Sequence, residues 1–339
     1  MKRKIVYIDN FLTKHGHTPT IGLSLAALLS NEGYEVIKAS TKKAKLLRLL
    51  DMLYVIFKER KGAVVLISTY SSDAFYFALA CSWMCRLFNI KYIPCLHGGN
   101  LPQRIKQSTK MSRQLFANSY MNVAVSGYLE DCIKKNGWKV TVIPNMIHIN
   151  EYPFLERKTC KPRLLWVRSF HEIYNPGLAI KVLFQLLKTN PDATLAMVGP
   201  DKDGSLAVCK QLAAELNVTD KVNFTGLLSR NEWIELSTQY DIFINTTNFD
   251  NLPVSIIEAL ALGMPIVSTN VGGLQYLITD KQNGLLVNAN SETGFVEAIN
   301  TLIQDSTMAE GLSRNARLLA EQFDWGHVKQ QWNTLLQGA

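Results

Sequence analysis

The chain has 339 residues, of which 47% are hydrophobic, and a formal net charge of +8. This length predicts two domains rather than one core, and the hydrophobic content excludes an intrinsically disordered chain. The longest strongly apolar stretch, residues 74–88, has 15 residues, whereas a membrane-spanning helix needs roughly 20. We therefore expect a globular protein with a buried helix at this stretch.

The charge is divided unevenly along the chain. Residues 1–150 contain 21 Lys and Arg against 8 Asp and Glu, a net charge of +13, whereas the remainder carries −5. Nucleic acid is not the expected partner, because no recognition motif accompanies the basic residues. The charge instead raises an anionic membrane surface as a partner of the first half.

Residues 41–61 combine basic side chains with an apolar pattern of helical period. Such a helix either lies at a membrane interface or packs its apolar face against the sheet of its own domain. The sequence leaves both interpretations open.

The six cysteines include no CxxC pair and no zinc-ligand spacing, and a strand-like run starts at Ile5, directly after the basic N-terminal residues. These features predict reduced thiols and no secretory signal peptide. The predicted location is therefore the cytoplasm, with peripheral association at the inner face of the membrane as an option.

Short apolar runs alternate with helix-length segments along the whole chain. The runs of the first half are residues 4–9, 34–39, 63–68, 91–96, 121–125 and 139–143, and those of the second half are 163–167, 193–198, 221–224, 241–244, 265–268 and 284–287. Strands separated by helices of this length indicate βαβ units and parallel sheets. The pattern predicts an α/β protein with two doubly wound, Rossmann-like domains.

Three prolines, Pro144, Pro153 and Pro162, interrupt a polar and irregular stretch in the middle of the chain. We place the linker at about 145–160, the first domain at 1–150 and the second at 160–322. A helix at about 325–339 follows, for which packing back on the first domain is one option. Ligands of open parallel sheets bind beyond the carboxyl ends of the strands, so the loops there are the candidate sites.

The most informative segment follows the strand at 241–244. Pro253 fits the first turn of a helix over 254–262, and the amides around Asn251 and Leu252 form its N-terminus, which favours anions. Asp250 stands beside that N-terminus. Asp250 alone is equally well explained as a helix cap.

Further positions extend this pattern. Glu258 lies about two turns into the helix, and Gly272-Gly273 allows a close backbone approach after the next strand. Arg168 directly follows the strand at 163–167, and arginine binds phosphate bidentately.

These motifs resemble family 4 of the retaining GT-B glycosyltransferases. The resemblance rests on Asp250-x7-Glu258, on the EALALGMPIVSTNVGG sequence that begins at Glu258, and on residues 143–145, 197–200, 222–226 and 323–325. It is strong over the second half of the chain and weaker but continuous over the first. It implies a GT-B fold with the active site in the cleft between the two domains.

The resemblance implies four catalytic residues. Glu258 would hold the ribose hydroxyls of the donor, Asp250 would meet the transferred sugar, and Arg168 would stabilise the leaving diphosphate. His97, which follows the strand at 91–96, would point toward the transferred sugar. Two departures stand out: the first acid is usually Glu, and the region of Tyr174 or Asn175 usually holds a lysine.

The resemblance also implies the residues that bind the donor. The amides of Asn251 and Leu252 would face the sugar and phosphates, Gly226 and Leu227 would lie beside the nucleobase, and Gly16 would lie in a loop near the phosphates. For the acceptor, the resemblance and the loop position together point to His15 and His17.

The activity so implied is retaining transfer from a nucleotide-diphosphate sugar to a hydroxyl of a saccharide or lipid-linked acceptor, in cell-surface polysaccharide or glycolipid synthesis. No cofactor and no metal is expected, and Asp201-Lys-Asp203 is interpreted as a solvated turn. The alternatives are a non-catalytic binding protein of the same fold, for nucleotide sugars or membrane surfaces, and a sugar-nucleotide epimerase.

Overall fold

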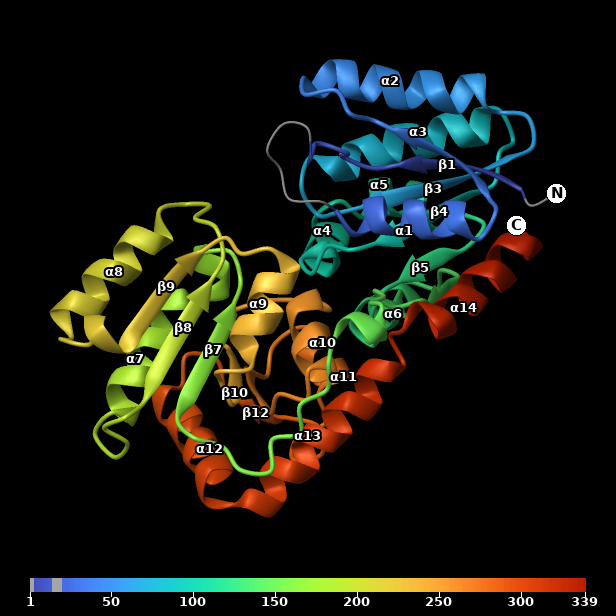
Figure 1. The fold of residues 1–339 in the computed structure, drawn as a ribbon. Coiled ribbons are helices and arrows are strands. Elements are labelled where there is room, and N and C mark those ends of the chain that lie inside the picture. The colour runs from blue at the N-terminus through green and yellow to red at the C-terminus, as the bar shows by residue number, and fades with distance from the viewer. Residues whose placement is uncertain (1–2, 14–19) are drawn as a thin grey trace. The chain divides into compact units, whose positions relative to one another are not determined.

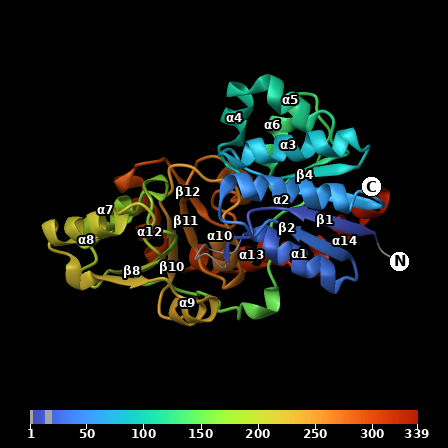
Figure 2. The same ribbon diagram turned by 90° about the horizontal axis from the view of Figure 1, so that it is seen from above.

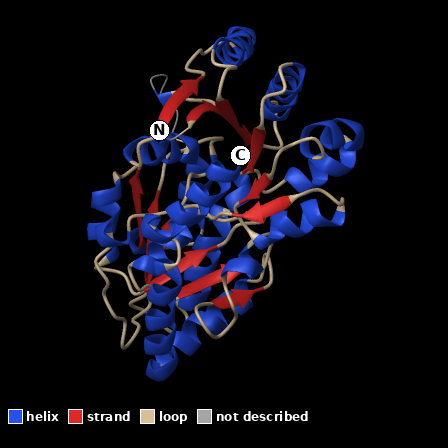
Figure 3. Ribbon diagram, turned by 90° about the vertical axis from the view of Figure 1, so that its right-hand side faces the viewer, coloured by secondary structure: helices blue, strands red, loops and turns tan. Residues whose placement is uncertain are grey.

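The computed structural model describes residues 3–13 and 20–339. The chain forms two compact units, residues 1–145 together with 326–339, and residues 146–325. Each unit contains one six-stranded parallel sheet whose strands are connected by helices (Figures 1 and 3). The predicted α/β fold with two doubly wound, Rossmann-like domains is therefore confirmed.

The first unit has the strand order β2-β1-β3-β4-β5-β6. The direction of winding reverses between β1 and β3, so this is the switch point at which such sheets bind ligands. Its elements are β1 (Lys4–Ile8), α1 (Ile21–Asn31), β2 (Glu35–Ala39), α2 (Lys45–Lys58), β3 (Ala63–Thr69), α3 (Ala74–Leu87), β4 (Tyr92–Leu96), α4 (Leu101–Gln107), α5 (Thr109–Phe116), β5 (Asn122–Ala124), α6 (Gly127–Lys135), β6 (Val140–Val142) and α14 (Trp325–Gly338).

Helix α14 returns to the first unit after the second is complete. Asn333 accepts a hydrogen bond of 2.8 Å from the Tyr34 hydroxyl, and Lys329 donates one of 3.4 Å to Glu32. Both partners follow α1 directly, so α14 lies beside the end of that helix.

The second unit has the strand order β12-β11-β10-β7-β8-β9, with its switch point between β7 and β10. Its elements are η2 (Ile149–Glu151), β7 (Arg163–Val167), η3 (Glu172–Tyr174), α7 (Pro176–Leu186), β8 (Thr194–Val198), α8 (Ser205–Glu215), η4 (Thr219–Lys221), β9 (Val222–Gly226), α9 (Arg230–Ser237), β10 (Ile242–Asn245), α10 (Val254–Ala261), β11 (Ile266–Thr269), α11 (Leu274–Leu277), β12 (Leu285–Val287), α12 (Glu292–Gln304) and α13 (Ser306–Glu321).

The two strands at this switch point are also tied by side chains. Trp166, on β7, is fully buried in the core, and its indole N–H donates a 3.1 Å hydrogen bond to the hydroxyl of Thr246, just after β10. The bond satisfies the single polar group of the largest core side chain and fixes the start of the loop that follows β10.

The irregular stretch before β7 packs on the second unit. Arg157 is buried there and donates to backbone carbonyls of Leu155, Leu262 and Ser237. Burial lowers the pKa of Arg157 to about 10. Because buried carbonyls need partners, this guanidinium attaches the stretch to the ends of α9 and α10.

Within residues 3–13 and 20–339, no helix is both long and apolar enough to cross a lipid bilayer. The apolar stretch expected to be a buried helix forms α3, which packs Phe75, Leu79 and Cys85 into the core. All six cysteines are free.

Candidate functional site

The switch point of the second sheet brings together two charged residues that the sequence singles out. Arg168 follows the last residue of β7, and Asp250 lies in the loop between β10 and α10. Nη2 of Arg168 forms an ion pair with Oδ2 of Asp250, and both side chains are largely buried. Neighbouring parallel strands bring the loops at their carboxyl ends together, and this explains the meeting of residues 82 positions apart.

The guanidinium of Arg168 also stacks on an aromatic ring. Its Cζ lies 4.5 Å from the ring centroid of Tyr174. Burial lowers the pKa of Arg168, but arginine stays cationic in proteins. The ring of Tyr174 therefore supports the positive charge of Arg168 through a cation–π contact. It lies in the region of Tyr174 and Asn175, where the resemblance implies a lysine.

Asn175, the other residue of the expected lysine region, has a structural position. It adopts φ 48°, and its side-chain amide donates to Oδ1 of Asn290 at 2.7 Å and to Oδ1 of Asn248 at 3.3 Å. The amide thereby joins the loops that follow β7, β10 and β12.

The backbone of Gly272 and Gly273 packs closely against the backbone of the Asp250 loop. The Gly273 N–H donates a 3.0 Å hydrogen bond to the Asp250 carbonyl. A Cβ at Gly272 would lie 2.1 Å from that carbonyl oxygen, and one at Gly273 would lie 2.1 Å from the oxygen of Asn251. The close backbone approach expected at this pair is made by the protein's own loop.

Glu258 lies on α10 in a second polar group. Its Oε1 accepts a 2.6 Å hydrogen bond from the Tyr152 hydroxyl and lies 3.7 Å from Nε of Arg230. Burial raises the pKa of Glu258, while the Tyr152 hydrogen bond and the charges of Arg230 and Arg168 act in the opposite direction. Glu258 is thus a buried acid held by Tyr152 beside the guanidinium of Arg230.

The predicted donor-binding residues lie around these groups. Asn251 and Leu252 are buried, whereas Leu227, after β9, is 72% exposed. The Asn251 N–H, expected to face the donor, donates to Oδ1 of Asp250 at 2.8 Å. Gly226 ends β9.

In the first unit, His97 follows β4. Both of its ring nitrogens are buried and have no hydrogen-bond partner within the described part of the chain. Its ring centroid lies 5.5 Å from that of Tyr70, and burial lowers the pKa of His97 to about 4. The imidazole is therefore neutral at physiological pH and keeps one donor and one acceptor available.

The loop after β1 contains the remaining predicted residues, Gly16, His15 and His17, which lie outside the described residues. Asp9, which precedes these residues, accepts a 2.7 Å hydrogen bond from the hydroxyl of Thr20, which follows them. Burial raises the pKa of Asp9.

Sequence reasoning missed Tyr152 and Arg230, which contact Glu258, and the stacking of Tyr174 on Arg168. Tyr174 lay in the region expected to hold lysine, and Tyr152 lies in the irregular stretch, where no periodic pattern marks it. Arg230 starts α9, shortly after β9 ends. The same strand-end argument that selected Arg168 could have found it.

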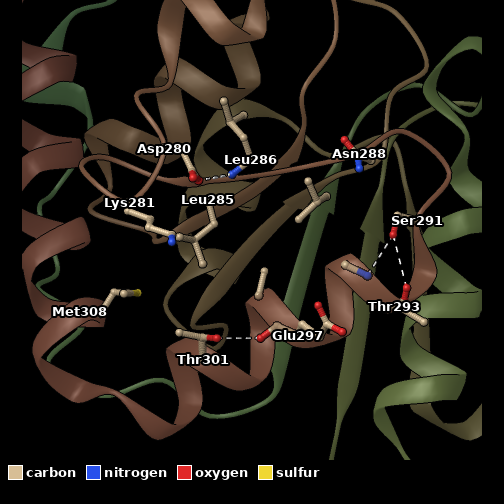
Figure 4. Close-up of a pocket in the computed structure, with 13 residues that line it drawn as sticks. Asp280, Lys281, Leu285, Leu286, Asn288, Ser291, Thr293, Glu297, Thr301 and Met308 are labelled. Carbon is tan, nitrogen blue, oxygen red and sulfur yellow. Dashed lines mark hydrogen bonds between the residues drawn. The ribbon is translucent and has the colours of Figure 1, made fainter.

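A separate pocket of about 500 Å³ lies between β12, α12 and the start of α13 (Figure 4). It contains none of the predicted residues, and several of its polar groups already have partners. Asp280 accepts from the Leu286 N–H at 2.8 Å, and Ser291 caps α12 by accepting from the Gly294 N–H at 3.0 Å. We therefore place the candidate site at the switch point.

The family model of glycosyl transferases group 1 matches residues 150–319. Because the match covers half of the chain, the chain belongs to this family. Glycogen synthase of Mycobacterium tuberculosis is 28% identical over 195 residues, which are 56% of this chain and 46% of that protein. The chain thus spans about half the length of the curated relatives it matches.

Solved structures share the fold over the whole chain. Sucrose-phosphate synthase of Thermosynechococcus elongatus has a TM-score of 0.82 at 15% identity and covers 99% of both chains. Anabaena Alr3699/HepE in complex with UDP-glucose has a TM-score of 0.77 at 16% identity, over 99% of this chain and 100% of the other. The GT-B fold predicted from the sequence is confirmed by these likenesses.

We predict that His97 titrates far below an ordinary histidine. Its pKa is lowered from 6.5 to about 4, so between these values the unfolded chain binds a proton that the folded chain does not. The free energy of unfolding should therefore fall as the pH drops from about 6.5 toward 4 and level off below. NMR titration of the ring resonance, assigned by its loss in His97→Gln, would measure this, and a midpoint near 6.5 would contradict it.

We predict that Gly273→Ala destabilises the second unit. The added methyl group would collide with the Asn251 carbonyl, at an expected cost of about 2 kcal/mol in the free energy of unfolding. Gly311→Ala is the matched control, because nothing lies within 4 Å of a Cβ at this position in α13, and it should stabilise by roughly 0.5–1 kcal/mol. Urea denaturation of both variants would test the difference, and equal stabilities would refute the close approach.

Proposed function

We propose that this protein is a metal-independent, retaining glycosyltransferase of family 4 that uses a nucleotide-diphosphate sugar. The observation that carries the proposal is the meeting of Arg168 and Asp250 at the switch point, with Glu258 on α10, the helix that follows the Asp250 loop. Two carboxylates and two guanidinium groups there suit a ligand that combines hydroxyl groups with a diphosphate. The family assignment supports transfer chemistry at this place.

The donor's ribose would be held by Glu258. A buried carboxylate accepts hydrogen bonds from two vicinal hydroxyl groups, and its position beside Tyr152 fixes its orientation. The nucleobase would lie near Gly226 and the exposed Leu227. The fold is shared with a protein solved in complex with UDP-glucose, and this supports a nucleoside diphosphate sugar as the donor class.

The diphosphate would be held by Arg168. A guanidinium on an aromatic platform is pre-oriented for bidentate binding of phosphate oxygens. Since Tyr174 and Asn175 occupy the region where the family has a lysine, Arg168 would act with the amides at the start of α10. Arg230, beside Glu258, is a second cation of the same group.

Transfer would proceed on one face of the sugar. The bond from the anomeric carbon to the phosphate oxygen breaks, the acceptor hydroxyl oxygen bonds to the same face, and its proton passes to the departing phosphate. Arg168 would stabilise the charge that develops on that phosphate. Asp250 would position the sugar, and neutral His97 would contribute a hydrogen bond rather than a proton.

The acceptor would be a saccharide or a lipid-linked hydroxyl bound by the first unit, whose sequence carries the basic excess. This charge favours work at an acidic cytoplasmic membrane surface, in polysaccharide or glycolipid synthesis. The competing hypothesis is a protein that binds nucleotide sugars without transferring them, and the absence of a lysine at Tyr174 and Asn175 is the observation that favours it.

We expect Arg168→Ala and Glu258→Gln each to lower the rate of transfer by on the order of 100-fold or more, since each removes a charge from the donor site. Arg314→Ala is the matched control, because its side chain is 58% exposed and forms ion pairs on the surface of the second unit. Released nucleoside diphosphate, measured over a panel of UDP-, GDP- and ADP-sugars, is the readout.

Near-normal turnover in both variants would overturn this site assignment. Calorimetry with UDP, GDP and ADP separates the alternatives. Binding without release of nucleotide toward any acceptor would favour the non-catalytic protein. Conversion of the donor alone into an isomer would favour an epimerase.

We expect transfer to persist in excess EDTA and to give a product with the anomeric configuration of the donor. Fixed guanidinium groups and helix amides would supply the positive charge that a divalent cation provides elsewhere. ¹H NMR of the first-formed product reads the anomeric configuration. Loss of activity in EDTA that Mg²⁺ restores, or an inverted product, would contradict the mechanism.

A further inference from the structure

We propose that the outer faces of α2 and α3 form the surface that docks this protein on an anionic lipid bilayer. This inference deepens the membrane location in the proposed function and rests on it, but it does not depend on the transfer reaction. It gives the docking surface named residues, and it assigns the two interpretations of residues 41–61 to different side chains of one helix.

Helix α2 has apolar side chains on both of its sides. Met52 and Ile56 are buried against the first unit. On the opposite side, Leu46, Leu50 and Phe57 follow the spacing of one helix face, and Leu47 and Tyr54 widen it. These five side chains are between 42% and 69% exposed. Packing on the domain's own sheet therefore accounts for only part of the apolar pattern.

Helix α3 continues this surface. The N-terminal ends of the helices are joined by the ion pair of Lys45 with Asp73, and the C-terminal ends by the rings of Phe57 and Phe88, with centroids 5.4 Å apart. The two helices thus run side by side in the same direction, as Figures 1 and 2 also show. Tyr76, Trp83 and Leu87 recur at i, i+7 and i+11, and each is 45–76% exposed. The name α2–α3 face is used below for these three residues and the five of α2.

Basic residues stand at both ends of the α2–α3 face. Residues 41–61 contain seven Lys and Arg against two Asp and Glu. Lys42 and Lys43 are exposed before α2, and Lys58 and Lys61 are exposed at its end. An apolar face with flanking lysines lets the rings and aliphatic groups enter the interface while the ammonium groups meet acidic headgroups.

The acidic residues of the segment are engaged within the first unit. Asp51 accepts a hydrogen bond from the Ser40 hydroxyl, and Glu59 forms an ion pair with Lys4 at 2.9 Å. Even with both acids counted, seven basic against two acidic residues leave residues 41–61 with a net charge of +5. A second copy of this chain would set basic ends against basic ends, which disfavours a symmetric dimer through this face.

Binding to vesicles without donor or acceptor tests the inference. The wild-type chain should float with phosphatidylcholine vesicles that contain 30% phosphatidylserine, and at least 10-fold less with pure phosphatidylcholine. The triple variant Leu46→Ser, Leu50→Ser, Phe57→Ser should bind the acidic vesicles at least 10-fold more weakly. Lys42→Glu with Lys43→Glu should weaken binding and reduce its dependence on salt.

The matched control is Val208→Ser with Leu318→Ser, which removes two apolar side chains that are 66% and 61% exposed in the second unit. It should bind the acidic vesicles like the wild type. Quenching of Trp83 by brominated lipid, taken as the difference from Trp83→Phe, gives a second readout at the face itself.

Three results would overturn the inference: equal flotation with neutral vesicles, unchanged binding by the triple variant, or a wild-type dimer that the triple variant dissociates in sedimentation. Calorimetric binding of UDP, GDP and ADP to the triple variant should equal that of the wild type. Failure of the donor site therefore shows in calorimetry with Arg168→Ala, and failure of the docking face shows in flotation.

Discussion

The ion pair between Arg168 and Asp250 is the interaction on which the candidate site depends. Either charge alone would be costly in this largely buried position, and each compensates the other. A diphosphate offers Arg168 a stronger bidentate partner, and it would free Asp250 to meet the sugar hydroxyl groups. In the proposed function, the pair would thereby link donor binding to the positioning of the sugar, because the carboxylate would become available once the anion binds.

The Glu258 group depends on a part of the chain that precedes the second sheet. Tyr152 reaches Glu258 from the irregular stretch before β7, and Arg157 attaches this stretch to the ends of α9 and α10. A segment predicted as a linker is therefore part of the wall of the candidate donor site. Strain on this segment would change the orientation of a predicted ribose-binding carboxylate without touching the donor.

The sequence predicted the sheets well and the side-chain partners poorly. All twelve strand positions were predicted within two residues of the observed bounds, because buried parallel strands are continuous apolar runs between helices. Strand ends then selected Arg168 and the Asp250 loop. Tyr152 and the stacking of Tyr174 could not be foreseen, since these contacts depend on how irregular loops fold over the sheet edge.

Helix α2 also shows what a sequence pattern leaves undetermined. Its periodic pattern is consistent with packing on a sheet and with lying on a membrane, and the structure shows that Met52 and Ile56 serve the first purpose while five exposed side chains remain. Periodicity cannot show which part of a wide apolar arc is covered, because the buried and the exposed apolar residues repeat with the same helical period. The exposed face belongs to the unit that carries the basic excess, whereas Arg168, Asp250 and Glu258 belong to the acidic one. The proposed attachment to a surface and the proposed binding of the donor would thus rest on different units, so each could be changed by substitution without altering the residues of the other.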